Sequence, residues 1–168
     1  MTSGGIWRAP KHSSDVLVLH ADDDEADAFA IRRALRKCGH AHRYERVASG
    51  EALLDALGST GDPTASAASE RCIVLLDLRM PGMGGLEALR RLRDDVAFPP
   101  HPVIVMSGSD DERDVAACYA AGANAYFAKP STADDLQALT HTIGAHWLDA
   151  VALPAPRALG DRTFRPRH

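Results

Sequence analysis

The chain of 168 residues is long enough for one domain with a full core, and its composition is that of an ordinary globular protein. Its net charge of −4 argues against a nucleic-acid-binding protein, because phosphate contacts need a basic face. The N-terminal residues lack the apolar core of a signal peptide, and no apolar stretch reaches the roughly 18 residues that a membrane helix needs. The three cysteines form no CxxC pair, so we expect a reduced, cytoplasmic protein without a membrane segment.

Strand and helix patterns alternate along the middle of the chain. Short apolar runs predict strands, and apolar residues three or four positions apart predict helices. The expected strands are 15–20, 42–47, 72–77, 102–107 and 125–129. The expected helices are 25–38, 50–57, 85–95, 110–121 and a last helix after residue 132. Strand and helix units in this alternation predict an α/β fold, with a parallel sheet covered by helices on both faces.

Several small or polar residues mark the ends of the expected helices. Gly39 stands where a helix C-cap is wanted. Ser109 and Glu112 have the spacing of a capping box, and so do Thr132 and Asp135. We therefore expect the last two helices to begin at these pairs.

Polar residues stand where four of the expected strands end. In a parallel sheet, ligands bind at the carboxyl ends of the strands. The residues at these ends are Asp22, Asp23, Asp77, Ser107 and Lys129. Each alone has an ordinary structural explanation, such as a helix cap or a turn, and we expect the neighbouring Asp24 simply to begin the helix. Together, and each at a strand end, they predict one site.

The chemistry of these side chains narrows the kind of site. Three carboxylates about 5 Å apart would repel one another by about 3 kcal/mol per pair at an effective dielectric constant near 20. Such a cluster needs a divalent cation or a raised pKa, and oxygen ligands suit Mg²⁺. With the Lys129 ammonium and the Ser107 hydroxyl facing the same space, the group could hold a phosphoryl group on Asp77.

Four motifs carry a resemblance to a known family. "HADDDEADAF", "LLDLRMPGMGG", "VIVMSG" and "YFAKP" resemble the motifs of response-regulator receiver domains. The resemblance covers about residues 14–148 and implies a flavodoxin-like (CheY-like) fold, with five parallel strands in the order 2-1-3-4-5. We accordingly expect a flexible N-terminal tail over 1–13, a receiver domain over 14–148, and a C-terminal extension and tail over 149–168.

The resemblance also implies roles for the site residues. Asp77 matches the phosphoacceptor. Asp22 and Asp23 match the acidic pair that holds Mg²⁺ together with Asp77, and the backbone carbonyl of Arg79 is a further ligand. Mg²⁺ is therefore the expected cofactor.

A conformational switch is implied in the same way. Ser107 matches the switch hydroxyl, Lys129 the lysine that pairs with the phosphoryl group, and Tyr126 the aromatic switch position. On phosphorylation, Ser107 moves, Tyr126 turns inward behind it, and the face formed by the fourth and fifth helices shifts. The Lys129–Pro130 bond is expected to be cis.

The segment "IGAHWLDAVALPAP" (143–156) continues beyond the usual receiver length. It carries four large apolar residues, which are Trp147, Leu148, Val151 and Leu153. They could fold back onto their own sheet, but we favour an exposed apolar seam for another subunit. The segment resembles the tail of phytochrome-associated response regulators, which implies a homodimer formed by the last helix and its extension, and a sensor histidine kinase of the bacterial phytochrome type as partner.

We interpret the chain as a stand-alone response regulator of a two-component phosphorelay. We expect a phosphoacceptor with self-catalysed phosphorylation and slow autodephosphorylation rather than an enzyme. One alternative is a Mg²⁺-dependent phosphatase with an Asp nucleophile, but such enzymes commonly carry a second Asp where Arg79 stands. Another is a flavin-binding electron carrier, which would need a phosphate-binding loop rich in hydroxyl groups and glycine after the first strand. The acidic stretch "ADDDEAD" stands there instead and would repel the cofactor phosphate. A third is a receiver that only binds partners and is never phosphorylated, against which the full set of site residues argues.

Overall fold

The computed structural model describes residues 16–39, 42–58, 71–95, 98 and 100–154. Its strands are β1 (Val16–Ala21), β2 (Arg43–Val47), β3 (Arg71–Leu76), β4 (Val103–Ser107) and β5 (Ala125–Ala128). All neighbouring strands are parallel, and the order in the sheet is β2-β1-β3-β4-β5. The predicted fold class and strand order are confirmed.

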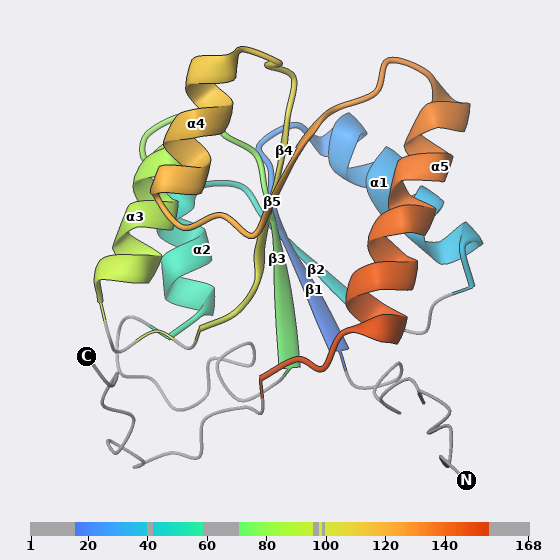
Figure 1. Ribbon diagram of the computed structural model, residues 1–168, viewed down its shortest axis with the longest axis horizontal. Coiled ribbons are helices and arrows are strands. Elements are labelled where there is room, and N and C mark those ends of the chain that lie inside the picture. The colour runs from blue at the N-terminus through green and yellow to red at the C-terminus, as the bar shows by residue number, and fades with distance from the viewer. Residues whose placement is uncertain (1–15, 40–41, 59–70, 96–97, 99, 155–168) are drawn as a thin grey trace, which may run out of the picture.

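Helices cover both faces of this sheet (Figure 1). They are α1 (Glu25–Lys37), α2 (Gly50–Ala56), α3 (Gly85–Asp94), α4 (Glu112–Ala120) and α5 (Ala133–Ile143). Helices α1 and α5 lie on one face, and α2, α3 and α4 lie on the other. After Ile143 the last helix continues as a π-helical segment of 7 residues, η2 (Gly144–Ala150). Among the described residues, no helix is both long and apolar enough to cross a membrane.

The central strands divide their side chains between two apolar cores. In β1, Val16 and Val18 belong to the core under α1 and α5, whereas Leu17 and Leu19 belong to the core under α2 and α3. Side chains alternate between the faces of a strand, so a strand buried on both faces is apolar at nearly every position. The continuous apolar runs of the sequence have this cause.

Caps begin and end the first helix as expected. The Asp24 carboxylate accepts hydrogen bonds from the N–H groups of Ala26 and Asp27, at 2.8 and 3.1 Å. At the other end Gly39 has a φ of +77°, a left-handed conformation that glycine adopts without steric cost. The helix α1 therefore begins and ends within one residue of where the sequence predicted.

The two expected capping boxes have different outcomes. Thr132 begins α5, and its hydroxyl accepts from the N–H of Asp135 at 3.1 Å, as predicted. The Ser109–Glu112 box is wrong, because α4 is capped by Asp111. The hydroxyl of Ser109 instead donates to the Asp114 carboxylate at 2.6 Å.

The C-terminal extension packs on its own domain. Leu148 and Leu153 are buried in the core under α1 and α5, and the partly buried Trp147 and Val151 pack against that core. The expected exposed seam is therefore wrong for Leu148 and Leu153. Burying each leucine contributes about 1.5–3 kcal/mol, which favours covering the chain's own sheet. The expected N-terminal tail and the part of the extension after residue 154 lie outside the described residues.

The imidazole ring of His101, just before β4, is buried without a hydrogen-bond partner among the described residues. The residue is 3% exposed, and neither ring nitrogen has a hydrogen-bond partner within the described part of the chain. Burial, with a smaller effect from the charge of Arg93, lowers the pKa of His101 from 6.5 to about 4. The folded state therefore holds this side chain neutral.

We expect His101 to make the protein less stable in acid. In the unfolded chain His101 takes up a proton near pH 6.5, whereas in the folded chain it does so only near pH 4. The free energy of unfolding therefore falls by about 3 kcal/mol as pH is lowered across this interval. Urea unfolding of wild type and His101→Leu between pH 7 and pH 4 measures this dependence. The variant should lose that part of the slope, and equal slopes would contradict the prediction.

Candidate functional site

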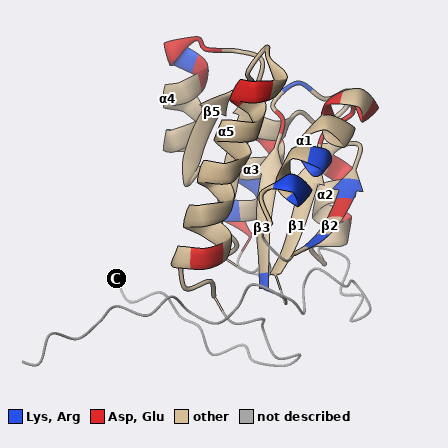
Figure 2. Cartoon of the chain, turned by 90° about the vertical axis from the view of Figure 1, so that its right-hand side faces the viewer, with Lys and Arg blue, Asp and Glu red and all other residues tan. Residues whose placement is uncertain are grey.

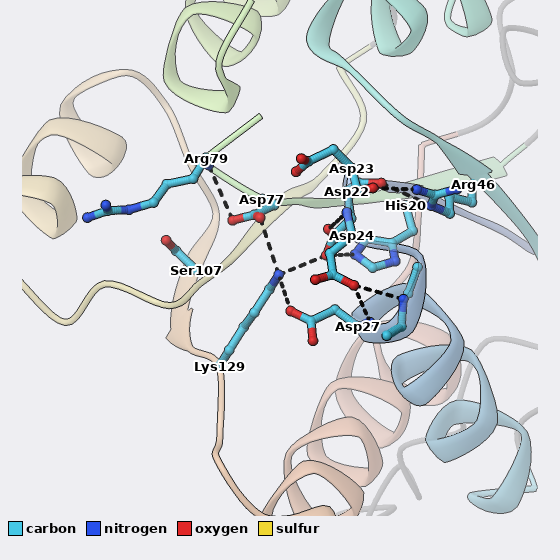
Figure 3. A network of polar contacts seen from close by, with 12 residues as sticks. His20, Asp22, Asp23, Asp24, Asp27, Arg46, Asp77, Arg79, Ser107 and Lys129 are labelled. Carbon is cyan, nitrogen blue, oxygen red and sulfur yellow. Dashed lines mark hydrogen bonds and ion pairs between the residues drawn. The ribbon is translucent and has the colours of Figure 1, made fainter. Parts of the chain in front are cut away.

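The predicted site residues meet at the carboxyl edge of the sheet (Figure 3). Asp22 follows β1, Asp77 follows β3 and Lys129 follows β5. The Lys129 ammonium donates to the Asp22 carboxylate at 2.8 Å and to the Asp77 carboxylate at 3.2 Å. Both carboxylates are buried, with residue exposures of 0% for Asp22 and 6% for Asp77. Three separate strands thus deliver one ion-paired group.

Backbone contacts hold Asp77 in this position. Its N–H donates to the carbonyl of Ala21 at 2.9 Å, which extends the pairing of β3 with β1 by one residue. The chain then turns back so closely that a Cβ at Gly85 would lie 2.0 Å from the carbonyl oxygen of Asp77. Within the same turn, Gly82 adopts a φ of +73°. These requirements explain why a glycine-rich turn follows the strand.

Three carboxylates form a group that could hold a metal ion. Asp22, Asp23 and Asp77 each offer one oxygen, and these oxygens lie within 4.8 Å of one another. At that separation, two carboxylates repel by about 3 kcal/mol at an effective dielectric constant near 20. A donor set made only of oxygen suits a hard cation such as Mg²⁺, so the residues fit the predicted metal.

The surroundings of this group are also acidic. Figure 2 shows that α1, α4 and α5 begin at the same edge of the sheet, with acidic residues in their first turns. Carboxylates at helix N-termini are stabilised by the partial positive charge of the helix end. The edge therefore carries a concentration of negative charge that favours the binding of cations.

A further carboxylate, Asp27 in the first turn of α1, also contacts Lys129, at 3.0 Å. Burial acts to lower the pKa of Lys129, but hydrogen bonds to Asp22 and Asp27 and the charge of Asp77 raise it above its ordinary value. Burial raises the pKa of Asp77, and Lys129 opposes that effect. Sequence analysis missed Asp27, because an acid in the first turn of a helix already has an explanation in the helix dipole.

His20 and Tyr44 form a second set of polar contacts next to Asp22, which the sequence did not predict. The Nδ1 of His20 is 2.7 Å from the Tyr44 hydroxyl, and its Nε2 is 3.5 Å from the Asp22 carboxylate. Burial, then the charges of Lys129 and Arg46, lower the pKa of His20 to about 3, so the ring is neutral at pH 7.

Arg46 forms hydrogen bonds with the backbone of Asp22 and Asp23. Its guanidinium donates to the carbonyls of Asp22 and Asp23, at 2.9 and 2.8 Å. Arg46 stands opposite His20 in the pairing of β1 with β2. The edge strand therefore contributes a cation that binds the backbone of this pair rather than its carboxylates.

The predicted switch residues lie on the other side of Asp77. Ser107 is buried at the end of β4, and its hydroxyl accepts from the N–H of Ser109 at 3.3 Å. The hydroxyl of Tyr126 donates to the carbonyl of Ser109 at 2.7 Å. Both predicted residues thus contact the same loop after β4. Their switching role stays a prediction.

Two expectations about the neighbouring backbone have different outcomes. The N–H of Arg79 lies 3.4 Å from Oδ1 of Asp77, while the role of its carbonyl as a metal ligand stays a prediction. The expected cis bond between Lys129 and Pro130 is wrong, because the described residues contain no cis peptide bond. The trans form is the one that X–Pro bonds ordinarily favour.

Comparison with known proteins identifies the family. The response regulator receiver domain matches residues 18–141. The probable methanogenesis regulatory protein FilR2 of Methanothrix harundinacea is 31% identical over 161 residues, covering 93% of this chain and 97% of that protein. The response regulator Rcp1 of Synechocystis is 29% identical over 139 residues, covering 83% and 93%.

Solved structures agree with this assignment. The phosphorylated cyanobacterial phytochrome response regulator RcpA has a TM-score of 0.73 at 27% identity, covering 83% of this chain and 98% of that one. The Mn²⁺-bound form of Rcp1 has a TM-score of 0.72 at 28% identity, covering 84% and 99%. The resemblance inferred from the four motifs is confirmed.

The close contact at Gly85 predicts a position-specific loss of stability. Gly85→Ala should lower the free energy of unfolding by about 2 kcal/mol or more, because its Cβ would overlap the backbone of Asp77. Gly108→Ala is the matched control, since a Cβ there meets nothing within 4 Å, and should change stability by less than about 0.5 kcal/mol. Urea unfolding measures both; equal losses would show that the turn is not constrained as described.

Proposed function

The chain belongs to the response-regulator receiver family, and from this premise we propose that it accepts a phosphoryl group on Asp77 from the phosphohistidine of a sensor histidine kinase. The observation that carries the proposal is the Lys129 ammonium, 3.2 Å from the Asp77 carboxylate and 2.8 Å from that of Asp22. A nucleophilic carboxylate beside a fixed positive charge is what phosphoryl transfer to Asp requires. The family match supports neither the phosphatase nor the flavin carrier.

The transfer exchanges one bond to phosphorus for another. A carboxylate oxygen of Asp77 attacks phosphorus and forms a P–O bond, while the P–N bond to the donor histidine breaks and its electron pair stays on the imidazole nitrogen. Lys129 neutralises negative charge on the phosphoryl oxygens, and the nearby N–H of Arg79 helps to orient the carboxylate. Slow autodephosphorylation follows when water attacks the same phosphorus: the P–O bond to Asp77 breaks, inorganic phosphate leaves, and the Asp77 carboxylate is restored.

Mg²⁺ is the cofactor that we propose for this site. Asp22, Asp23 and Asp77 would hold it, with the carbonyl of Arg79 as a further ligand. When bound, the ion would neutralise the phosphoryl oxygens together with Lys129. The Mn²⁺-bound form of Rcp1 supports a divalent cation in a related protein.

Ser107 and Tyr126 would carry the signal away from Asp77. The phosphoryl oxygens are charged acceptors that form stronger hydrogen bonds than neutral ones, so they draw the Ser107 hydroxyl toward Asp77. Tyr126 then gives up its bond to the Ser109 carbonyl and turns inward. The face formed by α4 and α5 shifts as a result.

The partners remain proposals with different kinds of support. Similarity to RcpA, described as a phytochrome response regulator, supports a phytochrome-type kinase as the donor. Homodimerisation through the last helix and its extension stays a prediction. Because Leu148 and Leu153 are buried within the chain, such a contact would depend on the partly buried Trp147 and Val151.

Phosphorylation is testable with a small acyl phosphate donor and Mg²⁺. We expect intact mass spectrometry to detect one added phosphoryl group on wild type, labile in alkali as an acyl phosphate is, and none on Asp77→Asn. Glu87→Gln, which removes an exposed carboxylate on α3, should be phosphorylated like wild type. Equal labelling of wild type and Asp77→Asn would refute the assignment.

Metal binding is testable separately from phosphorylation. Free Mg²⁺ at ten times its dissociation constant should raise the free energy of unfolding by about 1.4 kcal/mol, because it binds only the folded state. Thermal unfolding with and without Mg²⁺ measures the effect, which Asp22→Asn should greatly weaken and Glu87→Gln should preserve. An unchanged Mg²⁺ response in Asp22→Asn would exclude Asp22 as a ligand.

A further inference from the structure

All three hydrogen-bond donors of the Lys129 ammonium are in use. It carries three N–H groups, and three carboxylates surround it at 2.8 Å (Asp22), 3.0 Å (Asp27) and 3.2 Å (Asp77). An incoming phosphoryl oxygen can bind this ammonium only if one of the three carboxylates releases it. The identity of the released group follows from burial.

Asp27 is the partner that Lys129 can leave at the least cost. The Asp22 side chain is fully buried, and separating it from Lys129 would leave its charge to be balanced by the proposed Mg²⁺ alone. Asp77 carries the phosphoryl group itself, so its oxygens stay beside Lys129 after phosphorylation. The Asp27 side chain is 50% exposed, so water can replace the ammonium there.

The position of Asp27 is nevertheless well defined. The Asp24 carboxylate that caps α1 accepts from the Asp27 N–H at 3.1 Å, which fixes the first turn of the helix. Figure 3 shows the Asp27 carboxylate directed from that turn toward the end of Lys129. Asp27 therefore holds the ammonium at a fixed place until another acceptor takes it.

We propose that Asp27 is a positioning residue for Lys129. Before phosphorylation, Asp27 holds the Lys129 ammonium beside Asp77, and afterwards a phosphoryl oxygen replaces Asp27 as acceptor of one of its hydrogen bonds. The inference rests on the proposed function, because the exchange occurs only when a phosphoryl group is attached to Asp77. It assigns α1 a direct link to the phosphorylation state, since the released carboxylate belongs to the first turn of that helix.

Beryllofluoride, which imitates a phosphoryl group on a carboxylate, tests this exchange at saturating Mg²⁺. In Asp27→Asn the competing carboxylate is gone, so we expect a dissociation constant lower than in wild type by about two- to five-fold, as for removal of one exposed ion pair. A residue that only supported the fold would give unchanged or weaker binding. Asp27→Glu, which retains the charge, should bind less tightly than Asp27→Asn.

Glu25→Gln is the matched control. Glu25 lies in the same helical turn and forms an ion pair with Arg46, at 3.7 Å. Equal tightening in Glu25→Gln and Asp27→Asn would attribute the effect to general charge and overturn the inference. Binding by wild type together with an unchanged constant in Asp27→Asn would overturn it too. If wild type itself does not bind beryllofluoride, the proposed function fails, and the inference fails with it.

Discussion

The attraction between Lys129 and the carboxylates around it is the interaction on which the site depends. Asp22 and Asp77 are buried near each other, and their carboxylate oxygens would repel without a cation between them. The Lys129 ammonium donates to both carboxylates and offsets this repulsion. Asp77 is the proposed nucleophile and Asp22 a proposed metal ligand, so both proposed activities depend on the same ion-paired group.

The order of the strands supplies this group from several directions. Because β1 lies between β2 and β3, the end of β1 meets Arg46 on one side and Asp77 on the other. Lys129 comes from the loop after the edge strand β5, and its long, unbranched side chain reaches Asp22 from there. A parallel sheet makes this possible, since all its strands end at one edge.

Sequence predicted the parts of the site that depend on strand ends, and missed those that depend on register. Asp22, Asp77 and Lys129 could be found because each follows an apolar run. Asp27 and the alignment of Arg46 beside the acidic pair could not, because the rotation of a helix and the pairing of an edge strand arise only from tertiary packing. The C-terminal extension has the same limit. Periodicity identified its apolar residues, but not whether they pack on their own chain or on another.

The site is connected to the rest of the domain on two sides. On one side, Asp27 joins the Lys129 ammonium to the first turn of α1. On the other, the backbone N–H of Lys129 donates to the carbonyl of Ser107 at 2.7 Å, so the lysine and the proposed switch serine share a hydrogen bond between β5 and β4. Movement of Lys129 toward a phosphoryl group would therefore act on α1 and on the loop after β4 together.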